Sequence, residues 1–127
     1  RFSEPTRKAY LQAARGIVND DDKDIAAAMV RLGYLGRDQN PRPLVEAVRI
    51  MFEPLFEDRE WSPSDYDTVG KAQRVGELAF EHKLYRSPDH SVFLLRALIG
   101  LEGIVRQLGV KENYRRVFVQ CVERASR

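Results

Sequence analysis

The densest group of residues that could do chemistry is a run of carboxylates near the N-terminus. Asp20, Asp21 and Asp22 are followed closely by Asp24, and carboxylate oxygens are ligands that calcium and magnesium prefer. An EF-hand calcium loop needs alternating oxygen ligands, a central glycine and a glutamate at its twelfth position, and the run lacks that pattern. Carboxylates also stabilise the positive N-terminal end of a helix. We therefore interpret the run as the solvated start of a helix.

The side chains that usually serve as acids, bases or nucleophiles are few and scattered. His82 and His90 belong to neither a His-Glu-x-x-His helix nor a Cys/His zinc cluster. We expect His82 near a helix C-terminus, where it can contact the helix dipole, and His90 at the surface of a helix start. The single cysteine, Cys121, falls on the apolar stripe of the last predicted helix, which favours a buried, unreactive thiol. We therefore assign no catalytic, metal-binding or cofactor-binding residue in this chain.

Four charged residues are candidates for a structural or interface role. Arg96 and Glu102 are the charged residues of an otherwise apolar segment, and burying a charge is costly without a partner. Either they are paired within the structure, or they face a surface or site supplied by another segment. Arg115 and Arg116 could meet phosphates or an acidic partner, but glutamates interrupt the basic residues around them and no aromatic side chains are interleaved. We therefore do not expect nucleic acid as a partner.

The elements that must position these side chains are helical, because apolar residues recur with the helical period and no stretch shows sustained strand alternation. Ser3 is placed as an N-cap with Pro5 in the first turn, and Asn113 is placed as the N-cap of the last helix. Gly33 and Gly109 are placed as left-handed residues that end helices. Helices are expected over residues 3–17, from the acidic run to residue 33, over 44–55 with a kink or end at Pro54, and over 66–83, 90–108 and 113–125.

Two of these helices lead to specific expectations about the core. Apolar residues between positions 90 and 108 point in nearly every direction around the axis, which is typical of a helix surrounded by others. The helix over 66–83 contains Gly70 and Gly76, which each weaken it by about 1 kcal/mol relative to alanine unless close packing needs them. Its expected apolar stripe consists of Val69, Ala72, Val75 and Ala79. We predict an all-α fold, a compact bundle of about six helices around a buried central helix at residues 90–108.

Length and composition indicate one domain. The chain has 127 residues, with 21 basic and 19 acidic side chains and a formal net charge of +2, so no strong field favours a polyanionic partner. The longest apolar stretches, at residues 92–95 and 97–101, fall far short of the roughly 18 residues of a membrane span. A single cysteine fits a reducing compartment, and we expect a cytoplasmic location. Because the chain opens with Arg1 and has no signal-peptide pattern, we expect it to be a piece of a longer polypeptide.

Several short motifs follow one another in a characteristic order. They are Phe2-Ser3-x-x-x-x-Arg7-x-x-Tyr10-Leu11, the acidic run, Leu32-Gly33-Tyr34-Leu35-Gly36, Glu53-Pro54-Leu55-Phe56, Leu84-Tyr85-Arg86-Ser87-Pro88-Asp89, Leu94-Leu95-Arg96-Ala97-Leu98-x-Gly100-Leu101-Glu102-Gly103 and Asn113-Tyr114-Arg115-Arg116-Val117-Phe118. In this order, over nearly the whole chain, they resemble the C-terminal part of the UbiB/AarF-type (ABC1/ADCK-like) atypical kinase-like proteins.

The resemblance implies a role in a larger protein. In that family this stretch follows the Asp-Phe-Gly motif of a kinase-like C-lobe, so ATP and magnesium would be bound by upstream residues, and no position here matches a family catalytic residue. The expected function is a non-catalytic helical region that completes and supports the kinase-like domain of the same polypeptide. Such parents are linked with isoprenoid-quinone (ubiquinone) or lipid metabolism, with a membrane surface or quinone-biosynthesis proteins as partners. The alternative is a free-standing helical module that binds a protein or a ligand.

Overall fold

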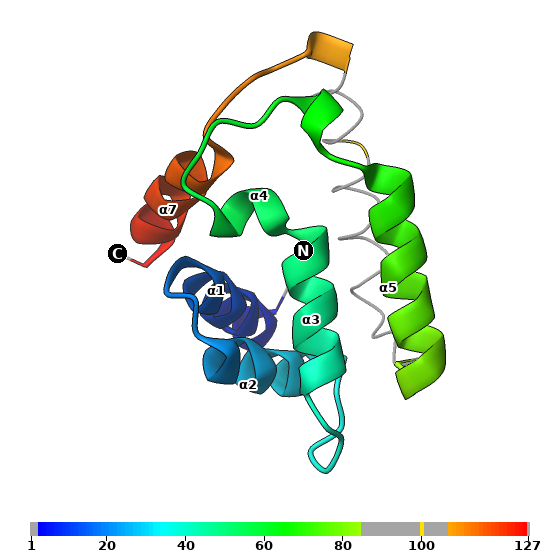
Figure 1. Ribbon diagram of the computed structural model, residues 1–127. Coiled ribbons are helices and arrows are strands. Elements are labelled where there is room, and N and C mark those ends of the chain that lie inside the picture. Colours follow the sequence, from blue (N-terminus) through cyan, green and yellow to red (C-terminus); the bar gives the residue numbers. More distant parts are fainter. Residues whose placement is uncertain (1–2, 85–99, 101–106, 127) are drawn as a thin grey trace.

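A computed structural model of the chain describes residues 3–84, 100 and 107–126 (Figure 1). Within these residues every regular element is a helix, which confirms the predicted all-α class. Figure 1 shows α3 (Arg42–Met51) between the pair α1 and α2 on one side and α5 on the other. The central helix predicted over 90–108 lies almost entirely outside the described residues and stays a prediction.

Among the helices that the structure describes, α1 (Glu4–Val18) and α2 (Asp22–Leu32) make the most extensive mutual contact. The hydroxyl of Ser3 accepts a hydrogen bond from the backbone N–H of Thr6, as expected of an N-cap. The second helix ends at Gly33, whose φ of 91° is in the left-handed region. Both ends therefore form as the local sequence predicts.

These two helices approach closely because Gly16 lies where they cross. A Cβ atom added at Gly16 would lie 2.8 Å from Cγ1 of Ile25 and 2.9 Å from its backbone nitrogen. Ile25 is fully buried, and the surrounding core is built from small and medium apolar side chains of α1 and α2. The core residues contributed by α1 and α2 are Ala9, Ala13, Ile17, Ile25, Ala28, Met29 and Leu32.

The predicted helix over 44–55 is two helices, because the chain turns at Phe52 between α3 and α4 (Glu53–Phe56). Pro54 lies in the first turn of α4, where its missing N–H is tolerated. That N–H would have bonded the carbonyl of Ile50 in a continuous helix. The ammonium of Lys71, on α5, donates to this carbonyl instead, at 3.1 Å, and also pairs with Glu53. The break therefore has a replacement donor and does not leave an orphaned carbonyl.

The fifth helix, α5 (Thr68–His82), packs on α3, and the predicted stripe matches the packed face only in part, because Val75 and Ala79 are half-buried. Its buried residue is Leu78, whereas Val69 is 79% exposed and Ala72 is also exposed. The predicted stripe was therefore wrong at these two positions. The reason is that α5 carries apolar residues on two faces, and the helical period alone does not tell which face meets α3.

The last helix, α7 (Tyr114–Ala125), packs on α1 and α4. Its N-cap is Asn113, as predicted, because the Asn113 side chain accepts from the backbone N–H of Arg116 at 3.1 Å. The segment before α7 is joined to the body by Trp61, which is 3% exposed and exchanges two backbone hydrogen bonds with Glu112, of 2.8 and 3.0 Å. The polar stretch after α4 and the start of α7 are thereby held together.

Candidate functional site

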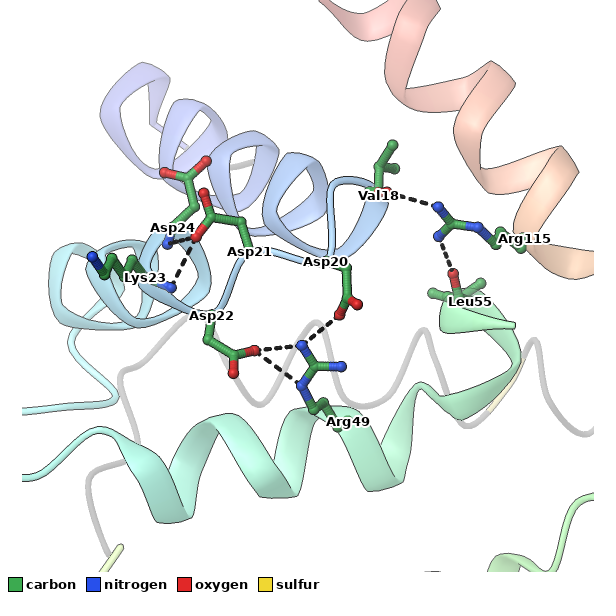
Figure 2. A network of polar contacts seen from close by, with 9 residues as sticks. All are labelled: Val18, Asp20, Asp21, Asp22, Lys23, Asp24, Arg49, Leu55 and Arg115. Atoms are coloured by element: carbon green, nitrogen blue, oxygen red, sulfur yellow. Dashed lines mark hydrogen bonds and ion pairs between the residues drawn. The ribbon is translucent and has the colours of Figure 1, made fainter. Parts of the chain in front are cut away.

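The acidic run forms the joint between α1 and α2 (Figure 2). Asp21 is the N-cap of α2, and its carboxylate accepts from the backbone N–H groups of Lys23 and Asp24, at 3.1 and 3.4 Å. Asp20 precedes it with a φ of 52°, in the left-handed region that aspartate tolerates better than most residues. The interpretation of the run as a helix start is therefore confirmed.

Two carboxylates of the run are not simply solvated, because Arg49 on α3 binds both. Its guanidinium reaches Asp22 at 2.5 and 2.9 Å and Asp20 at 2.5 Å (Figure 2). The hydrogen bond to Asp22 is the largest influence on the pKa of Arg49 and raises it, against a lowering by partial burial. The aspartates are more than half exposed, so the contribution to stability is about 1 kcal/mol or less.

The geometry of the run favours holding helices together over holding a metal ion. Asp21 is engaged with backbone N–H groups, and Asp20 and Asp22 with Arg49. Among residues 3–84, 100 and 107–126, no group of three or more His, Cys, Asp or Glu side chains has the proximity that a metal ion requires. The run therefore acts as a cap and a salt-bridge anchor.

Arg115, singled out from the sequence, lies half-buried where three helices meet. One terminal nitrogen donates to the carbonyl of Leu55 at 2.9 Å and the other to the carbonyl of Val18 at 2.7 Å (Figure 2). These carbonyls lie at the C-terminal ends of α4 and α1, which lack intrahelical donors and carry partial negative charge. The planar guanidinium of Arg115, on α7, thus joins two helix ends that are distant from it in sequence.

Arg116, its neighbour in sequence, has a surface position instead. Its Nε atom donates to Asp58 at 3.0 Å, and the side-chain amide of Asn113 donates to the same carboxylate oxygen at 2.7 Å. The hydrogen bonds from Asn113 and Arg116 lower the pKa of Asp58. Both side chains of the ion pair are more than 60% exposed, so this contact is worth little. The two arginines predicted together therefore have separate environments.

The other candidates are placed as follows. Arg96, Glu102 and His90 lie outside the described residues, so the pairing of Arg96 and Glu102 stays a prediction. His82 is the last residue of α5, as expected, and its Nε2 atom is 3.9 Å from Glu81. Cys121 is exposed, so the prediction of a buried thiol was wrong. The face of α7 turned to the core carries Phe118 and Val122, and Cys121 lies beside that face.

Sequence reasoning missed a basic groove along α1 and α2. The groove has a volume of about 500 Å³. Its lining residues are Arg7, Lys8, Leu11, Gln12, Arg15, Asp24, Arg31 and Ser126. The signal in the sequence was the spacing of Arg7, Lys8, Leu11 and Arg15 along one face of α1. The spacing on α1 does not reveal the groove by itself, because Arg31 lies on α2 and joins the lining only when α2 packs beside α1.

Gln12 organises the polar contacts of the groove. Its amide nitrogen donates to Asp24 at 3.0 Å, and its amide oxygen accepts from Arg31 at 2.6 Å. Arg15 donates from Nε to the hydroxyl of Ser126, at 3.2 Å. Two arginines of the groove are therefore held by neutral groups, unlike Arg49 and Arg116, which are paired with carboxylates.

None of the helices that the structure describes has the length and apolar character needed to cross a membrane. No family model, curated protein or solved structure matches the chain.

Proposed function

We propose that this chain is the C-terminal helical accessory region of a UbiB/AarF-type kinase-like protein, and that it supports the kinase-like domain without taking part in the chemistry. The support from sequence is the ordered set of motifs that resembles that family. The resemblance implies that the parent binds ATP and magnesium through upstream residues, and that it serves isoprenoid-quinone or lipid metabolism. A membrane surface or quinone-biosynthesis proteins would then be partners of the parent.

The structural observation that carries the proposal is an apolar face of α5 directed away from α3. Val69 and Phe80 are each 79% exposed, and Ala72 between them is also exposed. At 100° per residue, these three positions lie on one side of α5, and Leu78, the buried residue, lies opposite Val69. Large exposed apolar side chains grouped on one face favour an interaction surface. We assign this face to contact with the kinase-like domain of the same polypeptide.

The internal role of the polar residues supports a non-catalytic function. The charged groups best placed for chemistry hold helices together. The acidic run caps α2 and pairs with Arg49 of α3, and Arg115 binds carbonyls at the ends of α1 and α4. Such contacts fix the relative positions of α1, α3, α4 and α7. This is what a rigid support needs.

The proposal is tested by comparing the chain with the product of its complete gene. We expect no magnesium-dependent ATP hydrolysis from the chain alone and measurable hydrolysis from the complete product. Val69→Glu should lower the activity of the complete product, because it places a charge in the proposed contact. The same change should leave the melting temperature of the isolated chain nearly unchanged.

Val117→Glu is the matched control, since Val117 is an exposed valine on a different helix. Equal effects of the two variants on the complete product would contradict the assigned contact face. ATP hydrolysis by the pure chain that is lost on substituting one of its own residues would contradict the non-catalytic role.

One observation favours the alternative of a free-standing ligand-binding module. It is the basic groove on α1 and α2, which exists within this chain alone. A start codon directly before this segment in the gene would support the alternative, and an open reading frame encoding an Asp-Phe-Gly motif just upstream would support the kinase-like parent.

A further inference from the structure

The groove on α1 and α2 carries an uncompensated positive charge. Four of its lining residues are cationic, namely Arg7, Lys8, Arg15 and Arg31, and one, Asp24, is anionic. Arg7 is also paired with Glu4, which lies one turn earlier on α1. The positive charge of the remaining three is opposed within the lining by the single carboxylate of Asp24.

The hydrogen bonds of the groove leave most of its donors available. An arginine has five N–H donors. Arg31 uses one of them on the amide of Gln12, and Arg15 uses one on the hydroxyl of Ser126. Lys8 forms no hydrogen bond to a described residue. The partners of the two arginines are neutral, so they orient the guanidinium groups without neutralising them.

Three other arginines of the described chain, each held at a helix junction or a loop, are engaged differently. Arg49 and Arg116 bind carboxylates, and Arg115 binds two carbonyls at the negative ends of helices. Each of these cations has its charge compensated by the protein. Arg15 and Arg31 differ from these three, because neutral groups orient both of them in one groove and leave their charge for an external anion.

We propose that this groove binds the phosphate group of a small anionic ligand, with Arg15 and Arg31 as its main donors. The planar guanidinium matches the oxygens of a phosphate with two parallel N–H groups. The double charge of a phosphate monoester also suits a groove with several cations and one carboxylate. Leu11 offers the attached organic group an apolar contact, and about 500 Å³ is ample for such a ligand.

The lining favours a small or headgroup phosphate over a nucleic acid. No aromatic side chain is among the lining residues, so the groove lacks a surface on which bases could stack. The phosphate could belong to a free metabolite or to a lipid headgroup, and the same donors would serve both. This inference does not depend on the proposed function, because it concerns binding by this chain without any hydrolysis.

The experiment titrates the chain with inorganic phosphate and pyrophosphate by calorimetry, and measures co-sedimentation with phosphatidylcholine vesicles that contain or lack phosphatidic acid. Binding of the soluble anions would identify a free phosphate as the ligand. Binding only to vesicles with phosphatidic acid would identify a lipid headgroup. Absence of binding in both arms would overturn the proposal.

The variant Arg15→Gln/Arg31→Gln should weaken the observed binding by about tenfold or more, because two charge-assisted hydrogen-bonding groups are lost. Arg37→Gln is the matched control, since Arg37 is an exposed arginine outside the groove. It removes one positive charge and should leave the affinity within about twofold. Equal losses per charge removed in the groove variant and the control would show only non-specific attraction and overturn the site. The two single variants replace the double variant if its helical circular dichroism is lost.

Discussion

Replacing Gly16 by alanine should destabilise the chain, although alanine is the better helix former. The added Cβ would lie 2.9 Å from the backbone nitrogen of Ile25 and 3.3 Å from the backbone carbonyl oxygen of Asp21. These are backbone atoms of the α1–α2 connection and of α2, so they cannot move aside as the end of a flexible side chain does. The helices must separate, and the fully buried Ile25 must shift with them.

The magnitude follows from a comparison with Gly76→Ala. Gly16 and Gly76 both lie inside 15-residue helices, so the gain in helix propensity is about 1 kcal/mol for each. A Cβ added at Gly76 would meet no heavy atom of the described residues within 4 Å. The difference between the two variants therefore isolates the packing cost, which is about 2–3 kcal/mol for atoms forced into a filled core.

The measurement is urea unfolding followed by circular dichroism on the wild type and both variants, with thermal melting as a second readout. Gly76→Ala should be more stable than the wild type by up to about 1 kcal/mol, and Gly16→Ala less stable by about 1–2 kcal/mol. At about 4 °C per kcal/mol, the two melting temperatures should differ by roughly 8–12 °C. If Gly16→Ala were as stable as Gly76→Ala, the close approach of α1 and α2 would be refuted.

Three further results are expected. Arg115→Ala should cost about 2–3 kcal/mol of unfolding free energy, because the carbonyl groups at two helix ends lose a charged donor. Arg116→Ala should cost less than about 1 kcal/mol, because its ion pair is exposed. Equal costs in urea unfolding would contradict the contacts described. Hydrogen bonds lower the pKa of folded Asp58, so this carboxylate stabilises the fold above its unfolded pKa of about 3.9 and loses that effect as the pH falls through the folded value. Asp58→Asn should therefore be less stable than the wild type at pH 7, and the difference in unfolding free energy should vanish in acid. A difference independent of pH would count against the lowered pKa. The exposed Cys121 should react stoichiometrically with a thiol reagent without denaturant, and protection until unfolding would show that the thiol is buried.

Features determined by local chemistry could be predicted from the sequence. Ser3, Asn113 and Gly33 end or begin helices because their own side chains or backbone freedom satisfy groups within a few residues. The break before Pro54 was predicted for the same reason, because proline has no backbone N–H to donate to a helix, whatever the later packing of the chain. These predictions required no knowledge of the packing.

Features determined by packing could not be predicted in the same way. The helical period marks apolar directions on α5 and α7 but not which of them meets the core, so Val69 and Cys121 were placed wrongly. The contacts of Arg115 join residues 97 and 60 positions apart, and no local pattern encodes such a pair. The basic groove was missed for a similar reason, because its charge is complete only when Arg31 is brought beside α1.

The two proposals concern separate surfaces and can therefore hold together. Among the helices that the structure describes, α5 packs mainly on α3, whereas the groove is lined by α1, α2 and the residue that follows α7. A kinase-like domain resting on the outer face of α5 would leave Arg15 and Arg31 accessible. Phosphate binding should then have the same affinity in the isolated chain and in the complete gene product, and should be unaffected by Val69→Glu. Loss of phosphate binding in the complete product would mean that the partner covers the groove on α1 and α2, which would contradict the separation of the two surfaces.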